Sequence, residues 1–155
     1  MQADTQPRTA LLRAILAAAI LSTAVHYTHN FVEVHRYPGP HGAFDTITRV
    51  LIVVTWPVLT AIGLLGYRRY TEGRYQEARI GLAIYSVTGI VTLGHFIFGS
   101  PHIPALFYAT LFTDALTGLA VLNFALRYAK PAALPKRDVL APLREIDPMM
   151  PQDGG

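Results

Sequence analysis

The chain has 155 residues, of which 52% are apolar and 15% are charged, with a formal net charge of +3 and no cysteine. A soluble domain of this length needs more polar surface, and the missing cysteines exclude disulfides, thiolate metal sites and thiol nucleophiles. The positions of the basic residues are explained by orientation in a membrane, so no nucleic-acid partner is expected.

Long apolar segments follow one another along the chain, each close to the roughly 20 residues that a helix needs to cross a bilayer. They predict four transmembrane helices over residues 14–34, 47–67, 80–98 and 104–126. Short connections make consecutive helices antiparallel. The expected fold class is therefore an all-α integral membrane protein, an up-and-down four-helix bundle. A cleavable signal peptide is the alternative for the first segment, because small residues follow it at 22–24.

Three regions follow from these segments. A short N-terminal segment, 1–13, precedes the transmembrane domain, 14–128. Residues 129–155 carry repeated prolines and mixed charges, which predicts a disordered tail. The partner common to every interpretation is the lipid bilayer.

The basic residues predict the orientation of the bundle. Eleven of the 13 Lys and Arg residues lie before the first segment, between the second and third, or after the fourth; only Arg36 and Arg49 lie on the other side. The positive-inside rule then places the N- and C-termini in the cytoplasm and the loops 35–46 and 99–103 outside. The expected location is the inner (plasma) membrane of the cell.

Polar residues on the first predicted helix share one face. Their spacing of i, i+4, i+7, i+8 and i+11 forms a continuous stripe made of Ser22, His26, His29, Asn30 and Glu33. Ionisable groups that face lipid are costly, so the stripe should face the bundle interior or a cleft that opens outward.

The third and fourth helices add polar groups at a similar depth. His95 shares a face with Thr88 and Thr92, and Asp114 is the deepest charged residue. At ~1.5 Å per residue, Asp114 lies about 15 Å below the outer start of its helix and His26 about 12 Å below the outer end of its own. We therefore expect His26 to be the partner of Asp114. The predicted cleft is built from His26, His29, Glu33, His95 and Asp114.

Imidazoles beside carboxylates suit a metal or haem that handles electrons or protons. Imidazole binds copper, zinc and iron, and two histidines from different helices can hold haem b. His26, His29 and His95 are the candidate ligands of either group. Glu33 and Asp114 would complete a metal site, and they are also the candidate catalytic carboxylates.

Two other functions remain open, so the sequence does not decide whether the protein is an enzyme. One is a non-enzymatic membrane subunit that packs in a larger complex or a homo-oligomer, with the polar stripe holding helices together. The other is a metal-free acid/base enzyme. Residues 29–33 read HNFVE, which resembles the HxxxE pattern of the emopamil-binding, sterol-isomerase-like membrane proteins. The resemblance covers five residues, and the family's activity is not carried over from it. The isomerase-like alternative, acting on a lipophilic substrate, follows from His29 and Glu33, which at i, i+4 can pass a proton.

A histidine in a solvated loop has little burial cost, so its presence there is weaker evidence for a functional site. The turn-rich loop from His35 to Gly42 is expected to be exposed, together with its two histidines. The alternative is a lid over the cleft, with His35 or His41 adding a ligand. His102, in the second outer loop, is interpreted in the same way.

Overall fold

The computed structural model describes residues 5–129 and is all-helical over that range. Its elements are α1 (Thr5–Val32), the 3-10 turn η1 (Val34–Arg36), α2 (Ala43–Thr71), α3 (Tyr75–Ile90), the 3-10 helix η2 (Val91–Ile97) and α4 (Ala105–Tyr128). Four helical spans, with α3 and η2 forming one of them, are long and apolar enough to cross a membrane. The predicted all-α bundle with four apolar spans is confirmed. The tail expected from residue 129 lies outside the described residues from 130 onward.

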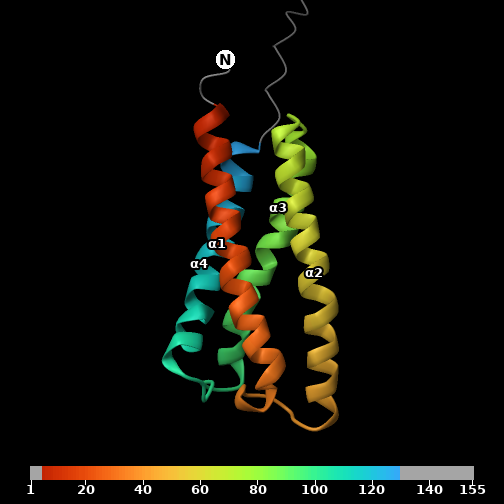
Figure 1. Cartoon of the computed structure of the whole chain (residues 1–155), viewed down its shortest axis with the longest axis vertical. Helices are drawn as coiled ribbons and strands as arrows, with labels where there is room; N and C mark the ends of the chain where they lie inside the picture. Colours follow the sequence, from red (N-terminus) through yellow and green to blue (C-terminus); the bar gives the residue numbers. More distant parts are fainter. Residues whose placement is uncertain (1–4, 130–155) are drawn as a thin grey trace, which may run out of the picture.

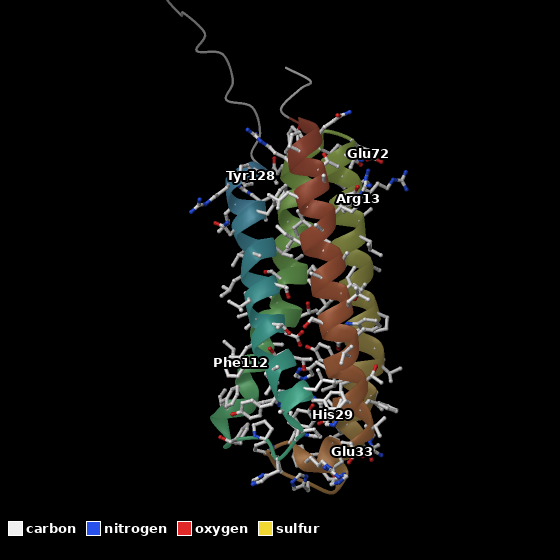
Figure 2. All side chains as sticks on the ribbon, turned by 60° about the vertical axis from the view of Figure 1, so that its left-hand side comes forward. Arg13, His29, Glu33, Glu72, Phe112 and Tyr128 are labelled. Carbon is white, nitrogen blue, oxygen red and sulfur yellow. The ribbon has the colours of Figure 1, made fainter. Side chains whose placement is uncertain are left out.

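The helices run up and down, and each packs beside its neighbours in the chain (Figure 1). Helix α1 also packs against α4, which closes the bundle. The start of α1 and the end of α4 lie at one end, at the top of Figure 1. The connections from α1 to α2 and from η2 to α4 lie at the other, which we call the loop end. Figure 2 shows His29 and Glu33 near the loop end and Arg13 and Glu72 near the opposite end.

The helix boundaries differ from those of the apolar segments. Helix α2 extends past the predicted 47–67 at both ends, because hydropathy marks the part of a helix that hydrocarbon would surround. The predicted helix 80–98 changes to a 3-10 helix at Val91. There the Thr92 hydroxyl donates to the carbonyls of Gly89, at 2.6 Å, and of Leu111 on α4, at 3.1 Å. The three-residue turn places Thr92 and His95 on the same side.

Close packing of α3 against α4 depends on Gly89 and Gly118. A Cβ at Gly89 would overlap the main-chain carbonyl oxygen of Asp114, and one at Gly118 would lie 2.8 Å from the carbonyl oxygen of Ser86. Asp114 is thereby held directly against α3. The apolar core fills the half of the bundle away from the loop end and includes Leu12, Leu16, Leu82, Tyr85 and Phe124.

Candidate functional site

His26 and Asp114 form a fully buried pair between α1 and α4. Nδ1 of His26 lies 3.1 Å from Oδ2 of Asp114, and both side chains are 0% exposed. The two atoms lie within ion-pair distance without hydrogen-bond alignment, and neither has a hydrogen-bond partner among the described residues. The Ser22 hydroxyl donates to the other carboxylate oxygen and lies 2.7 Å from the hydroxyl of Thr113. The predicted partnership of His26 with Asp114 is confirmed.

The opposite edge of the His26 ring meets His95. The two Nε2 atoms lie 3.3 Å apart, and the rings are stacked with their centroids 5.3 Å apart. Asn30 joins them from α1, one turn after His26, with Nδ2 3.3 Å from Nε2 of His95. Its amide oxygen is buried and has no hydrogen-bond partner. Two imidazole nitrogens and one amide therefore converge from α1 and η2.

Tyr37 covers this group from the loop between α1 and α2, and sequence reasoning missed it. Its side chain is buried, its ring lies 4.7 Å from the His95 ring, and its hydroxyl lies 3.0 Å from Nδ1 of His29. Burial raises the pKa of Tyr37 above its usual range, and the negative charge of Asp114 raises it further, so the phenol keeps its proton. The available signal was an aromatic residue among the prolines and glycines of a polar loop.

His29 and Glu33 lie apart from the buried histidine pair. The His29 ring stacks on Phe107 of α4 at 3.8 Å and reaches His95 only through Tyr37. Glu33 accepts a hydrogen bond from Nε of Arg36 at 2.9 Å and lies 3.4 Å from Nε2 of His35. Glu33 directly follows Val32, the last residue of α1, and its carboxylate pairs with groups of the adjoining 3-10 turn. No contact joins His29 and Glu33 as an acid/base pair among the described side chains.

The predicted five-residue cluster is therefore not assembled at one point. Between residues 5 and 129, no three His, Asp or Glu side chains could hold a metal ion together. The reason is the orientation of His26, which faces Asp114 with Nδ1 and His95 with Nε2. Asp114 stands behind the imidazole, where a metal-bound histidine usually has a carboxylate partner.

The separation of the His26 and His95 Nε2 atoms suits either an N–H···N hydrogen bond or two ligands of one ion. Two nitrogens bound to a tetrahedral metal at ~2.0 to 2.1 Å lie about 3.3 Å apart, and the His26 and His95 Nε2 atoms are separated by 3.3 Å. The atom of Asn30 next to Nε2 of His95 is its amide nitrogen, at 3.3 Å, which is a hydrogen-bond donor. The candidate donor set is thus the two imidazole nitrogens.

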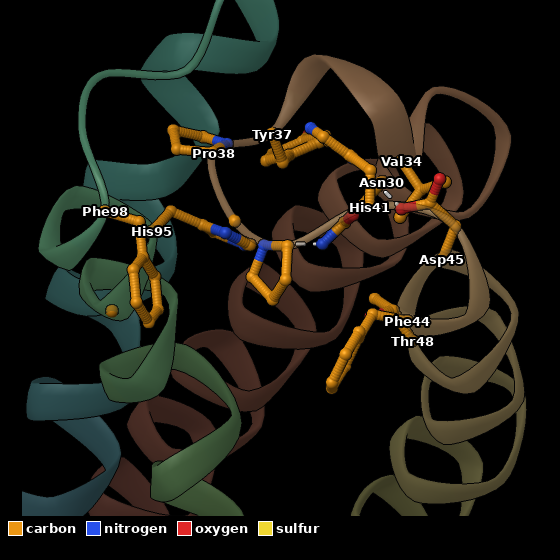
Figure 3. A pocket seen from close by; sticks show the side chains of 13 residues that line it. Asn30, Val34, Tyr37, Pro38, His41, Phe44, Asp45, Thr48, His95 and Phe98 are labelled. Atoms are coloured by element: carbon orange, nitrogen blue, oxygen red, sulfur yellow. Dashed lines mark hydrogen bonds and ion pairs between the residues drawn. The ribbon is translucent and has the colours of Figure 1, made fainter.

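A cavity of about 230 Å³ leads to this group from the loop end. Asn30, Tyr37 and His95 line it, with His41 and Asp45 on the side of α2 (Figure 3). Nδ1 of His41 lies 3.2 Å from Oδ1 of Asp45. Both predicted loop histidines, His35 and His41, thus pair with carboxylates in exposed positions. The cavity gives His95 a route to water.

No protein family, curated protein or solved structure matches the chain. The resemblance over residues 29–33 to the emopamil-binding proteins gains no support from these comparisons. Function must therefore be inferred from the side chains themselves.

Proposed function

We propose that the protein is a multi-pass membrane protein that binds one transition-metal ion on the Nε2 atoms of His26 and His95. The observation that carries the proposal is the 3.3 Å between these atoms, which equals the nitrogen separation expected at a tetrahedral ion. Two imidazole ligands suit zinc or copper. Such an ion would lower the pKa of a bound water or, if it is copper, exchange electrons.

The surroundings of His26 also support an ion. Histidine ligands almost always donate their second ring N–H to a carboxylate, a carbonyl or water, which fixes the tautomer. Asp114 lies within reach of this role, with Oδ2 3.1 Å from Nδ1 of His26, and a change of alignment between the two groups would complete the hydrogen bond. Ser22 holds the carboxylate in turn. Because burying a carboxylate at this depth costs free energy, its presence beside His26 favours a functional role.

A bare ion suits the pair better than haem b. A haem held by two histidines has its macrocycle between the two imidazoles. Here the nitrogens of His26 and His95 contact each other, and the rings of Tyr37 and His26 already flank His95.

The distribution of basic residues supports an orientation with the loop end outside the cytoplasm and both termini inside. The cavity beside His95 opens at the loop end. In the plasma membrane, the ion would therefore exchange with the extracytoplasmic side.

Metal-free proton transfer is the second candidate, and the continuous chain of polar contacts favours it. Ser22, Asp114, His26 and His95 contact one another in that order, and His95 reaches the cavity. In this case the contact between the imidazoles is an N–H···N hydrogen bond. It would move a proton between Asp114 and the cavity.

Zinc affinity separates these functions. The detergent-purified protein is titrated with Zn²⁺ against a chromophoric chelator, beside His26→Ala, His95→Ala and the exposed-loop control His102→Ala. We expect one ion per chain, a loss of at least about 100-fold in both site variants, and wild-type affinity in the control. Equal affinity in all four proteins, or no binding by the wild type, would reject the metal site and leave the proton relay.

A further inference from the structure

A second opening lies between α1 and α4 at the loop end. This groove has a volume of about 710 Å³ and shares no lining residue with the cavity beside His95. Ala24, Val25 and Phe107 contribute apolar wall, and His29 lies among them. Glu33 and Arg36 line its end nearest the loops. No step of the proposed metal chemistry uses these residues.

The groove changes from charged to apolar along the bundle. Ala24 and Glu33 are nine positions apart on the α1 path, which corresponds to about 13 Å. The charged end lies where a membrane surface would be, and the apolar end points toward the hydrocarbon. This gradient matches an amphiphile whose polar group lies near the loops and whose tail runs down α1. Because Arg36 is paired with Glu33 at 2.9 Å, the charged end offers no net charge to a phosphate or carboxylate head group.

His29 supplies a hydrogen-bond donor to this groove. The Tyr37 hydroxyl has one hydrogen-bond partner among the described residues, Nδ1 of His29 at 3.0 Å. Where the phenol donates to that nitrogen, the neutral imidazole carries its own proton on Nε2, and this is the tautomer that the groove would offer to a ligand. A ligand that meets Nε2 must therefore present an acceptor. Phe107, stacked on His29 at 3.8 Å, adds an aromatic wall beside it.

We propose that the groove binds a membrane-soluble quinone. One carbonyl oxygen accepts a hydrogen bond from Nε2 of His29, the conjugated ring lies beside Phe107, and the apolar tail follows Ala24 and Val25. A quinone is uncharged, which agrees with the internally paired Glu33 and Arg36. Tyr37 joins this site to the buried pair, because its hydroxyl contacts His29 and its ring packs on His95. The binding step itself does not require a metal.

The test is a calorimetric titration of the metal-free, detergent-solubilised protein with a benzoquinone that carries one isoprene unit. The matched ligand is the corresponding dimethylbenzene, in which methyl groups replace the two carbonyl oxygens, so it has a similar shape and no hydrogen-bond acceptor. The variants are His29→Ala, which removes the donor, and Val25→Trp, which fills the groove. Val54→Trp is the control, because Val54 is 56% exposed on α2 and outside the groove.

We expect saturable binding of one quinone per wild-type chain, at least tenfold weaker binding in His29→Ala and Val25→Trp, and unchanged binding in Val54→Trp. The dimethyl compound should bind the wild type about as weakly as the quinone binds His29→Ala. Non-saturable partition, or equal affinity in all four proteins, would overturn the proposal. Zinc affinity measured on the same variants keeps the two sites separate, since His29→Ala should leave it within about threefold of wild type.

Discussion

Nδ1 of His26 faces Oδ2 of Asp114 at 3.1 Å, in a place that excludes water from both side chains. A carboxylate at this position favours the tautomer with its proton on Nδ1. That tautomer leaves a lone pair on Nε2, the atom that contacts His95. The pair between α1 and α4 therefore leaves His26 with a lone pair on Nε2, which can be donated to a metal ion or can accept a hydrogen bond.

Substitution of Asp114 tests whether its carboxylate supports metal binding by His26. We expect Asp114→Asn to lower zinc affinity by about 10- to 100-fold, the usual effect of losing a carboxylate behind a histidine ligand. The chelator competition described above measures it. Asp45→Asn removes a carboxylate that contacts an exposed histidine, His41, and should leave zinc affinity unchanged. Wild-type affinity in Asp114→Asn would show that His26 does not depend on Asp114.

The approach of α3 to α4 should not tolerate a methyl group at Gly89. In Gly89→Ala the new Cβ overlaps the carbonyl oxygen of Asp114, so we expect the free energy of unfolding to fall by about 1 to 3 kcal/mol. Denaturation in mixed micelles measures the change. Gly94→Ala is the matched control, because its Cβ would meet only a side-chain atom of Ile97 at 3.9 Å. Equal stability of the two variants would contradict the close packing at Gly89.

The Thr92 hydroxyl should stabilise the junction between η2 and α4. Thr92→Val keeps the shape but removes the donor to the carbonyls of Gly89 and Leu111. We expect a loss of about 0.5 to 1.5 kcal/mol in the free energy of unfolding. In Thr110→Val the lost bond joins only residues of α4, at 2.6 Å to Phe107, so its effect should be smaller. A larger loss of stability in Thr110→Val than in Thr92→Val would contradict a stabilising role of Thr92 between η2 and α4.

Alkaline pH should weaken the contribution of Tyr37 to stability. Burial raises its folded-state pKa, so this contribution is complete below the ordinary tyrosine pKa of about 10 and is lost as the pH rises above it. The difference in thermal midpoint between wild type and Tyr37→Phe should therefore shrink between about pH 10 and pH 12. Tyr128→Phe, at an exposed residue of the opposite end, should show no such trend. A difference that stays constant for Tyr37→Phe would contradict its burial.

Much of the fold could be predicted because hydropathy and short connections determine it. Four apolar spans and antiparallel neighbours leave few arrangements for a chain of this length. The depth argument also paired His26 with Asp114 correctly, since both positions were counted from helix ends at the same side of the bundle. Inside a regular helix, the period of 3.6 residues was enough to predict which side chains share a face.

The predictions were less complete where the helical period stops. Glu33 belonged to the polar stripe only if α1 continued through it, and the helix ends one residue earlier. His95 kept its place because a 3-10 turn still aligns it with Thr92. Tyr37 depends on how the loop folds back over the bundle, which no local pattern specifies. The sequence could name the histidines, but it could not tell which ring atoms would meet.

X-ray absorption at the zinc edge tests the central claim most directly. The sample is the full chain loaded with one equivalent of Zn²⁺, measured beside the His26→Ala/His95→Ala double variant. The two-histidine site predicts outer-shell scattering from two imidazoles, with nitrogen neighbours at ~2.0 Å, in the wild type only. A wild-type spectrum without imidazole scattering, or one that the double variant reproduces, would contradict metal binding by His26 and His95.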